Sequence, residues 1–264
     1  MNNKIIVDDI IIKNNRISYK YTVSGEMSKF FNLNQEFFIE YSEDMSMVPK
    51  QVAVIPLLCN ILPVAWISDA EIILEEVDKD FYDSVEEFKQ GYIDMLPGID
   101  FKGKLSPKKV IACDYVPTEK VAAFFSGGVD AFSTLFSHLD EKPTLVTLWG
   151  SDVFFDDVEG WNNVKNHIAS VGKQFDLETV YIKSSFRMFL FENVLDKEVF
   201  GKVKDTWWHA FQHGIGLIGH VAPYAYKAKL KTVYIASSYT EKDRGKVTCA
   251  SDPTIDNFVR YTGC

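Results

Sequence analysis

The four cysteines of this 264-residue chain are far apart and form no CxxC pair. That scarcity argues against a disulfide-stapled secreted domain and favours free thiols in a reducing cytoplasm. The amino terminus turns acidic at Asp8 and Asp9 and lacks the long apolar stretch and small-residue cleavage site of a signal peptide. We therefore expect a cytoplasmic protein.

Basic residues are also scarce, with 28 Lys and Arg against 37 Asp and Glu and a net charge of -9. This balance argues against a surface that mainly neutralises nucleic-acid phosphates, although a local basic groove would be compatible with it. A membrane-spanning run is missing too, because residues 52–67 are too few and contain Pro56, Asn60 and Pro63. A buried helix or a pair of strands is the expectation there, and neither a nucleic-acid nor a membrane partner is expected.

Residues 1–115 have the pattern of a mixed α+β accessory domain in which we find no catalytic motif. The predicted elements are a hairpin over 5–24 with its turn at Asn14-Asn15, strands over 37–41 and 70–77, and a helix over 83–95. The basic stretch 102–109 contains Gly103 and Pro107 and is interpreted as a connecting segment.

Residues 116–264 instead alternate between strand and helix patterns. Strands are predicted over 121–125, 144–149, 179–182 and 232–236, and helices over 131–139, 161–175 and about 207–229. This alternation predicts an α/β fold, a parallel sheet with helices on both faces and ligands at the carboxyl ends of its strands.

One motif joins the first of these strands to its helix, the turn Ser126-Gly127-Gly128-Val129-Asp130. Two glycines allow backbone N–H groups to approach phosphate oxygens, and the helix presents its positive end to the same place. A tight connection without a ligand is the alternative. The dinucleotide-fold and Walker patterns fit worse, because neither GxGxxG nor GK[ST] is present here.

At this turn the chain resembles the PP-loop (N-type) ATP pyrophosphatases, whose signature is SGGxDS. Ala131 stands where the last serine would be, and Ser133 or Thr134 is one turn further into the helix. The resemblance implies an AMP-forming enzyme that uses ATP and Mg²⁺, with Asp130 as a catalytic and metal-binding residue. The implied nucleotide-binding residues are Ser126, Gly127, Gly128, Val129, Asp130 and Ser133.

The carboxyl-terminal part is most similar to the 7-cyano-7-deazaguanine synthase branch of that superfamily. A helix rich in small residues leads to a strand and to Ser237-Ser238, and the segment Cys249-Ala250-Ser251-Asp252-Pro253 follows. In that branch the segment reads Cys-Arg-Pro, so Asp252 departs from it. The branch also carries a four-cysteine zinc site, so Zn²⁺ is expected only if a carboxyl-terminal module is missing from this chain. Ser237 is a further candidate contact to the nucleotide.

Other candidate residues follow the next two strands. Trp149 ends the strand over 144–149 and Asp152 follows it, and both are candidate contacts to the nucleotide. Asp152 would contact Mg²⁺ or the ribose, or simply form an Asx turn. Lys183 ends the following strand, and its charge would neutralise triphosphate or remain a solvated surface charge.

Three histidines, His209, His213 and His220, have helical spacing that places them on one face of the helix over 207–229. We expect this stripe to face the substrate side of the cleft without binding metal, since no third ligand is evident. Proton transfer and purely structural packing are both open, and His213 is the preferred catalytic candidate because it lies beside Gly214.

The resemblance, together with these patterns, implies an ATP-dependent ligase or synthase. An oxygen of a carboxylate, amide or base attacks the α-phosphate of ATP, pyrophosphate leaves, and a nitrogen nucleophile displaces AMP. The alternatives are a nucleotide-binding subunit that has lost the chemistry, or a tRNA-modifying PP-loop enzyme. The partners expected are ATP, an unidentified small-molecule or macromolecular substrate, and a second copy in a homodimer.

Overall fold

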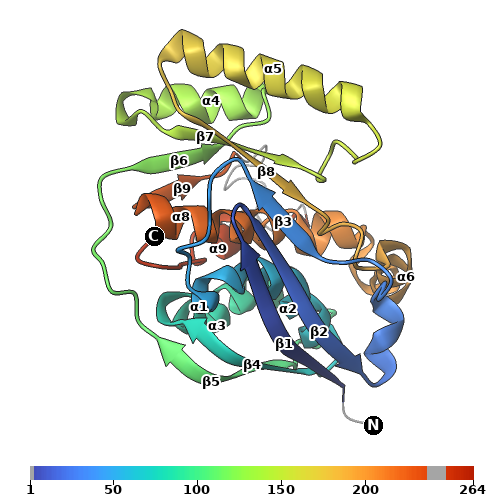
Figure 1. Ribbon diagram of the computed structural model, residues 1–264. Coiled ribbons are helices and arrows are strands. Elements are labelled where there is room, and N and C mark those ends of the chain that lie inside the picture. Colours follow the sequence, from blue (N-terminus) through green and yellow to red (C-terminus); the bar gives the residue numbers. More distant parts are fainter. Residues whose placement is uncertain (1–2, 237–247) are drawn as a thin grey trace.

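The structure, a computed structural model, describes residues 3–236 and 248–264 and has an α/β fold (Figure 1). Within these residues a nine-stranded, mostly parallel sheet has the order β5-β4-β1-β2-β3-β8-β7-β6-β9. The strands are β1 (Lys4–Lys13), β2 (Arg16–Ser24), β3 (Phe38–Tyr41), β4 (Glu71–Asp78), β5 (Lys104–Ile111), β6 (Val121–Phe124), β7 (Thr144–Trp149), β8 (Thr179–Ser184) and β9 (Thr232–Tyr234).

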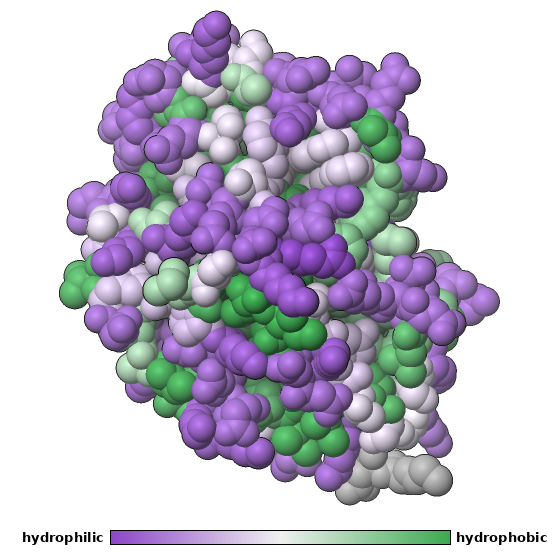
Figure 2. Space-filling view, viewed as in Figure 1, coloured by the Kyte–Doolittle hydropathy of each residue, from purple (hydrophilic) through white to green (hydrophobic). Residues whose placement is uncertain are grey.

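The helices cover both faces of the β6–β9 part of the sheet. The α-helices are α1 (Lys50–Ala53), α2 (Ile55–Ile67), α3 (Lys79–Met95), α4 (Val129–Ser137), α5 (Val158–Phe175), α6 (Glu192–Val203), α7 (Ile215–Ile218), α8 (Ala222–Ala228) and α9 (Pro253–Asp256). Figure 1 shows α4 and α5 on one side of these strands, and α8 and α9 on the other. The outer surface over α4 and α5 is mainly hydrophilic (Figure 2), as expected for amphipathic helices that pack one face on a sheet.

The amino-terminal hairpin forms as predicted. β1 and β2 pair antiparallel, and Asn14 takes the left-handed conformation, with φ 52°, that a tight turn requires. The Asn15 amide donates to Tyr41 O (2.8 Å), which ties the turn to β3.

The apolar segment over 52–67 is helical, so the prediction of a buried helix is confirmed and the alternative of two strands is wrong. Twelve of the thirteen residues of α2 are buried. The Asn60 side chain satisfies its hydrogen bonds inside the core, donating to Pro56 O (2.8 Å) and accepting from Gln212 Nε2 (3.0 Å). In the part of the chain that the structure describes, no helix is long and apolar enough to cross a membrane.

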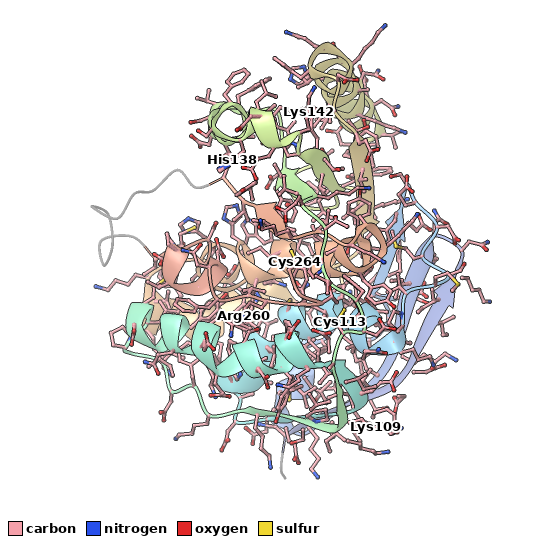
Figure 3. The ribbon with its side chains drawn as sticks, turned by 90° about the vertical axis from the view of Figure 1, so that its left-hand side faces the viewer. Lys109, Cys113, His138, Lys142, Arg260 and Cys264 are labelled. Atoms are coloured by element: carbon pink, nitrogen blue, oxygen red, sulfur yellow. The ribbon has the colours of Figure 1, made fainter. Side chains whose placement is uncertain are left out.

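The interpretation of 102–109 as a connecting segment is wrong. β5 begins at Lys104 and pairs parallel with β4, with Pro107 opposite Leu74. β5 is an edge strand of the described sheet, where lysines reach solvent and a proline costs no ladder bond on the open side. Figure 3 shows Lys109 on this strand and Cys113 on the segment that leads from it toward β6.

The strands of the two predicted domains belong to one sheet, because β3 pairs antiparallel with β8. The division into 1–115 and 116–264 stays a prediction. In the second part, the order β8-β7-β6-β9 reverses direction at β6. A crevice at the carboxyl ends of β6 and β9 is the place where sheets of this kind bind ligands.

The single helix predicted over about 207–229 is wrong. A π-helical turn over Trp208–Gln212 is followed by α7, a short 3₁₀ turn and α8. The break falls at Gly214, with φ -97° and ψ -88°, where a Cβ would lie 2.0 Å from Ala250 O. The close approach of that backbone, which the sequence periodicity does not report, interrupts the helix. The predictions also missed α6.

Candidate functional site

The site is built around the turn between β6 and α4. Gly127 has φ +81°, and a Cβ on it would lie 2.8 Å from His167 Cδ2, so the position requires glycine. Gly128 caps α4 in an extended conformation, and its N–H donates to Ser126 Oγ (3.4 Å). The predicted sequence of strand, glycine turn and helix is confirmed as a geometry.

The first turn of α4 offers an exposed surface to a ligand. Val129 and Asp130 are exposed, and Asp130 lies where the positive end of the helix dipole favours a negative group. Ser133, one turn further on, is also exposed, and its carbonyl accepts from Ser137 Oγ (2.9 Å). Backbone N–H groups, an exposed carboxylate and hydroxyls therefore lie together at the end of β6.

Next to this turn lies a cavity of about 150 Å³. Its lining, among described residues, consists of Phe124, Phe125, Ser126, Ala131, Val146, Thr147, Leu148, Ser151, Asp152, His213, Leu217, Ile235 and Ala236. Val146, Leu148 and Leu217 belong to the large core on the α7 side of the sheet, whereas Phe125 and Ala131 belong to the smaller core on the α4 and α5 side. The cavity therefore lies at the ends of the strands, with walls from both sides of the sheet. The lining combines apolar walls with a few polar groups, as small-molecule pockets do.

His213 is the imidazole of the cavity wall. Its backbone N–H donates to Trp208 O (2.9 Å), the wide hydrogen bond of the π-turn, and its ring packs edge-on against Trp208 at 5.3 Å. Burial lowers the pKa of His213, and the negative charge of Asp152 opposes that shift only in part. His213 is therefore neutral near pH 7, when an imidazole has one donor and one acceptor nitrogen.

The stripe of three histidines is wrong for His220. That side chain is fully buried, with Nδ1 2.6 Å from Gly216 O and Nε2 2.8 Å from Ser184 Oγ. His209 lies beside His213, with ring centroids 6.2 Å apart, and its Nδ1 is 2.6 Å from Asp205 Oδ2. The π-turn and the break at Gly214 change the helical phase, so the three rings do not share one face.

Lys183 and Trp149 lie apart from His213, on the opposite face of the sheet. The Lys183 ammonium is 4.6 Å from the centroid of the Trp149 ring, and Trp149 stacks on Trp161 of α5 at 5.1 Å. Ile182, beside Lys183 in β8, packs in the large core on the other side, as strand alternation requires. Neither Lys183 nor Trp149 is among the described residues that line the cavity.

Arg187 is the cation whose charge reaches His213, where it lowers the imidazole pKa. Its guanidinium lies 4.1 Å from the Trp208 centroid, pairs with Glu192 through two bonds of 2.6 and 2.8 Å, and donates to Ser151 O (3.4 Å). In the sequence, Arg187 and Lys183 are both cations near the end of the same predicted strand, and nothing local distinguishes them. The turn after β8 brings Arg187, and not Lys183, beside the cavity.

Two further predicted positions have other surroundings. Asp252 caps α9 by accepting from Thr254 N (2.8 Å), which gives a structural reason for a carboxylate there. Ser237, a predicted nucleotide contact, lies outside the described residues.

Sequence reasoning assigned no role to Cys249, whose Sγ lies 3.6 Å from His213 Nδ1. The two residues are separated by thirty-five others, and no local sequence pattern predicts their contact. Across residues 3–236 and 248–264, no group of three or more His, Cys, Asp or Glu could hold a metal ion.

No protein-family model, curated protein or solved structure matches this chain.

Proposed function

We propose that the chain binds ATP with its phosphates on the turn Ser126–Asp130 and transfers AMP to a substrate oxygen. The observation that carries this proposal is the turn itself. It needs glycine at 127, opens α4, and lies at the reversal of strand order beside a cavity. Amides at a helix N-terminus bind anions, and sheets of this kind bind ligands at such a reversal.

The chemistry follows from where charge develops. A substrate oxygen attacks the α-phosphate, the bond to pyrophosphate breaks, and charge grows on the leaving group. The Gly128 N–H donates to Ser126 Oγ, and the other backbone amides at the start of α4 would donate to the leaving group as its charge grows. The exposed Asp130 carboxylate offers an oxygen ligand of the kind a hard cation prefers, and it would hold Mg²⁺, which would neutralise the phosphate charge. A nitrogen nucleophile then displaces AMP, as the resemblance to PP-loop synthases implies.

Asp130 gives the first test. Asp130→Asn should remove ATP-dependent pyrophosphate release, measured with a pool of candidate carboxylic acids and amides, and leave the thermal unfolding midpoint unchanged. Asp140→Asn, an exposed carboxylate after α4, is the matched control and should retain full activity. Full activity of Asp130→Asn would remove Asp130 from the mechanism, and bound nucleotide located away from 126–130 would overturn the site.

A second candidate is a nucleotide-binding subunit without chemistry. Ala131 supports it, because this residue lines the cavity at the position of the signature serine and brings no hydroxyl. This candidate predicts ATP binding with no pyrophosphate release for any acceptor, and an Ala131→Ser variant that remains inactive. Pyrophosphate release by the unmodified chain would exclude it.

A further inference from the structure

The segment around Cys249 is fastened to the π-turn beside the cavity. Asp205 Oδ2 accepts from Thr248 Oγ1 (2.9 Å) and lies 2.6 Å from His209 Nδ1. On the other side of Cys249, the N–H of Ala250 donates to His209 O (2.8 Å). These bonds hold the Thr248 side chain and the Ala250 backbone on either side of Cys249, and so restrict the direction of the Cys249 side chain.

The thiol of Cys249 faces His213 and not the cavity. Its Sγ is 3.6 Å from His213 Nδ1, the residue is 6% exposed, and it is absent from the described lining to which His213 belongs. Burial raises the pKa of the Cys249 thiol, so the group is protonated at neutral pH. A protonated buried thiol is a poor nucleophile, which argues against covalent chemistry at this residue.

The direction of the hydrogen bond follows from the two partners. Sulfur is a weak acceptor, whereas the unprotonated nitrogen of a neutral imidazole is a good one. We propose that Cys249 is a positioning residue whose S–H donates a hydrogen bond to His213 Nδ1. The ring proton of His213 is then on Nε2, and this N–H donates a hydrogen bond to an oxygen of the ligand in the cavity.

Four groups surround His213 and decide whether it keeps that form. Asp152 favours the charged imidazolium, while His209 and Arg187 disfavour it, and Cys249 is neutral. Burial is the largest influence, and the net effect is a lowered pKa of His213. The ring therefore polarises a ligand oxygen as a neutral donor and does not remove a proton from it. The identity of that ligand rests on the proposed function, but the tautomer does not.

The tautomer is measurable without any nucleotide. In the full chain with ¹⁵N-labelled histidine, the His213 signals, assigned by their loss in His213→Gln, should show the Nε2–H form at neutral pH. Cys249→Ala and the larger Cys249→Val both remove the donor and should give a mixture of tautomers. Cys113→Ala, a thiol on the segment after β5 (Figure 3), is the control and should change nothing. An Nδ1–H form in the unmodified chain, or an unchanged tautomer in both Cys249 variants, overturns the proposal.

A second experiment tests the donor at Nε2 with ATP and Mg²⁺ as the probe. The amide nitrogen of Gln extends to about the position of Nε2, whereas that of Asn extends to about Nδ1. His213→Gln should therefore bind ATP within about threefold of the unmodified chain, and His213→Asn at least about tenfold more weakly. Equal affinities of the two variants would overturn the donor role. If the unmodified chain binds no ATP, the proposed function fails, and the tautomer measurement still decides the role of Cys249.

Discussion

The two faces of the sheet at the ends of β7 and β8 are built from different chemistry. Toward α7, Asp152 and His213 line the cavity at the ends of the strands, with Arg187 near them. On the α5 face, Lys183 rests on Trp149, which stacks on Trp161. Both groups combine a cation with aromatic rings at the same edge of the sheet, but the first borders the cavity and the second is packed against α5. The difference shows that the strand end and the face of the strand must both be known before a residue is assigned to a site.

Trp161→Ala is expected to have the largest effect, and on stability alone. Trp161 is nearly buried, and a large-to-small change of this kind costs about 3–5 kcal/mol of unfolding free energy. Urea denaturation would measure the loss, with Trp161→Phe as the milder control. ATP affinity of the folded variant should stay within about twofold. An affinity loss in proportion to the stability loss would show that the faces are coupled.

The pH dependence of the unfolding free energy tests the burial of His220 in the core on the α7 side of the sheet. Burial lowers the pKa of His220 to about 4, below its value of about 6.5 in an unfolded chain. Between these values the unfolded chain binds more protons at this residue. The contribution of His220 to the unfolding free energy is therefore complete above pH 6.5 and falls by up to about 3 kcal/mol as the pH drops to 4.

The contribution of His220 must be measured as a difference between the unmodified chain and a His220 variant, because the contribution of Asp256 to the unfolding free energy changes with pH in the opposite direction. Burial raises the pKa of Asp256 to about 8, and this carboxyl favours the folded state more as the pH falls. Denaturation of the unmodified chain and of His220→Gln should therefore be compared at each pH. A constant difference in unfolding free energy from pH 4 to 7 would contradict the assignment.

Two glycine variants sharpen the contrast inside the turn. Gly127→Ala strains a positive φ and collides with His167, and it should weaken ATP binding at least about tenfold. Gly128→Ala keeps an extended backbone, and its Cβ would lie 3.4 Å from Ser126 Oγ, so its affinity should stay close to that of the unmodified chain. Isothermal titration with ATP and Mg²⁺ distinguishes the two, and equal losses would show that the φ of Gly127 is not what the site needs.

Lys183→Met is expected to have the smallest effect. Removal of its ammonium from the rings of Trp149 and Phe155 should cost about 0.5–1 kcal/mol of stability and leave ATP affinity nearly unchanged. The matched variant Arg187→Met removes the cation on the cavity face and should lower ATP affinity more. A larger loss for Lys183→Met would return Lys183 to the phosphate site that its position along the sequence suggested.

The failed predictions share a cause. The lysine-rich stretch before residue 110 is a strand because β4 offers a partner, and the helix over 207–229 breaks because Ala250 O approaches Gly214. His220 can be buried because Ser184, thirty-six residues earlier, forms a hydrogen bond with its Nε2. In each case the deciding atom comes from a distant part of the chain, where local periodicity carries no information.

The sequence by itself determined the elements whose causes are local. The hairpin at Asn14, the apolar α2 and the glycine turn after β6 all follow from conformational preference and the spacing of apolar residues. Only the tertiary structure decided which strand ends meet in the cavity, on which face each side chain lies, and that Cys249 reaches His213. The physical reason is that strand alternation and helix phase are set by packing across the sheet, and contacts between remote segments appear only when the core has formed.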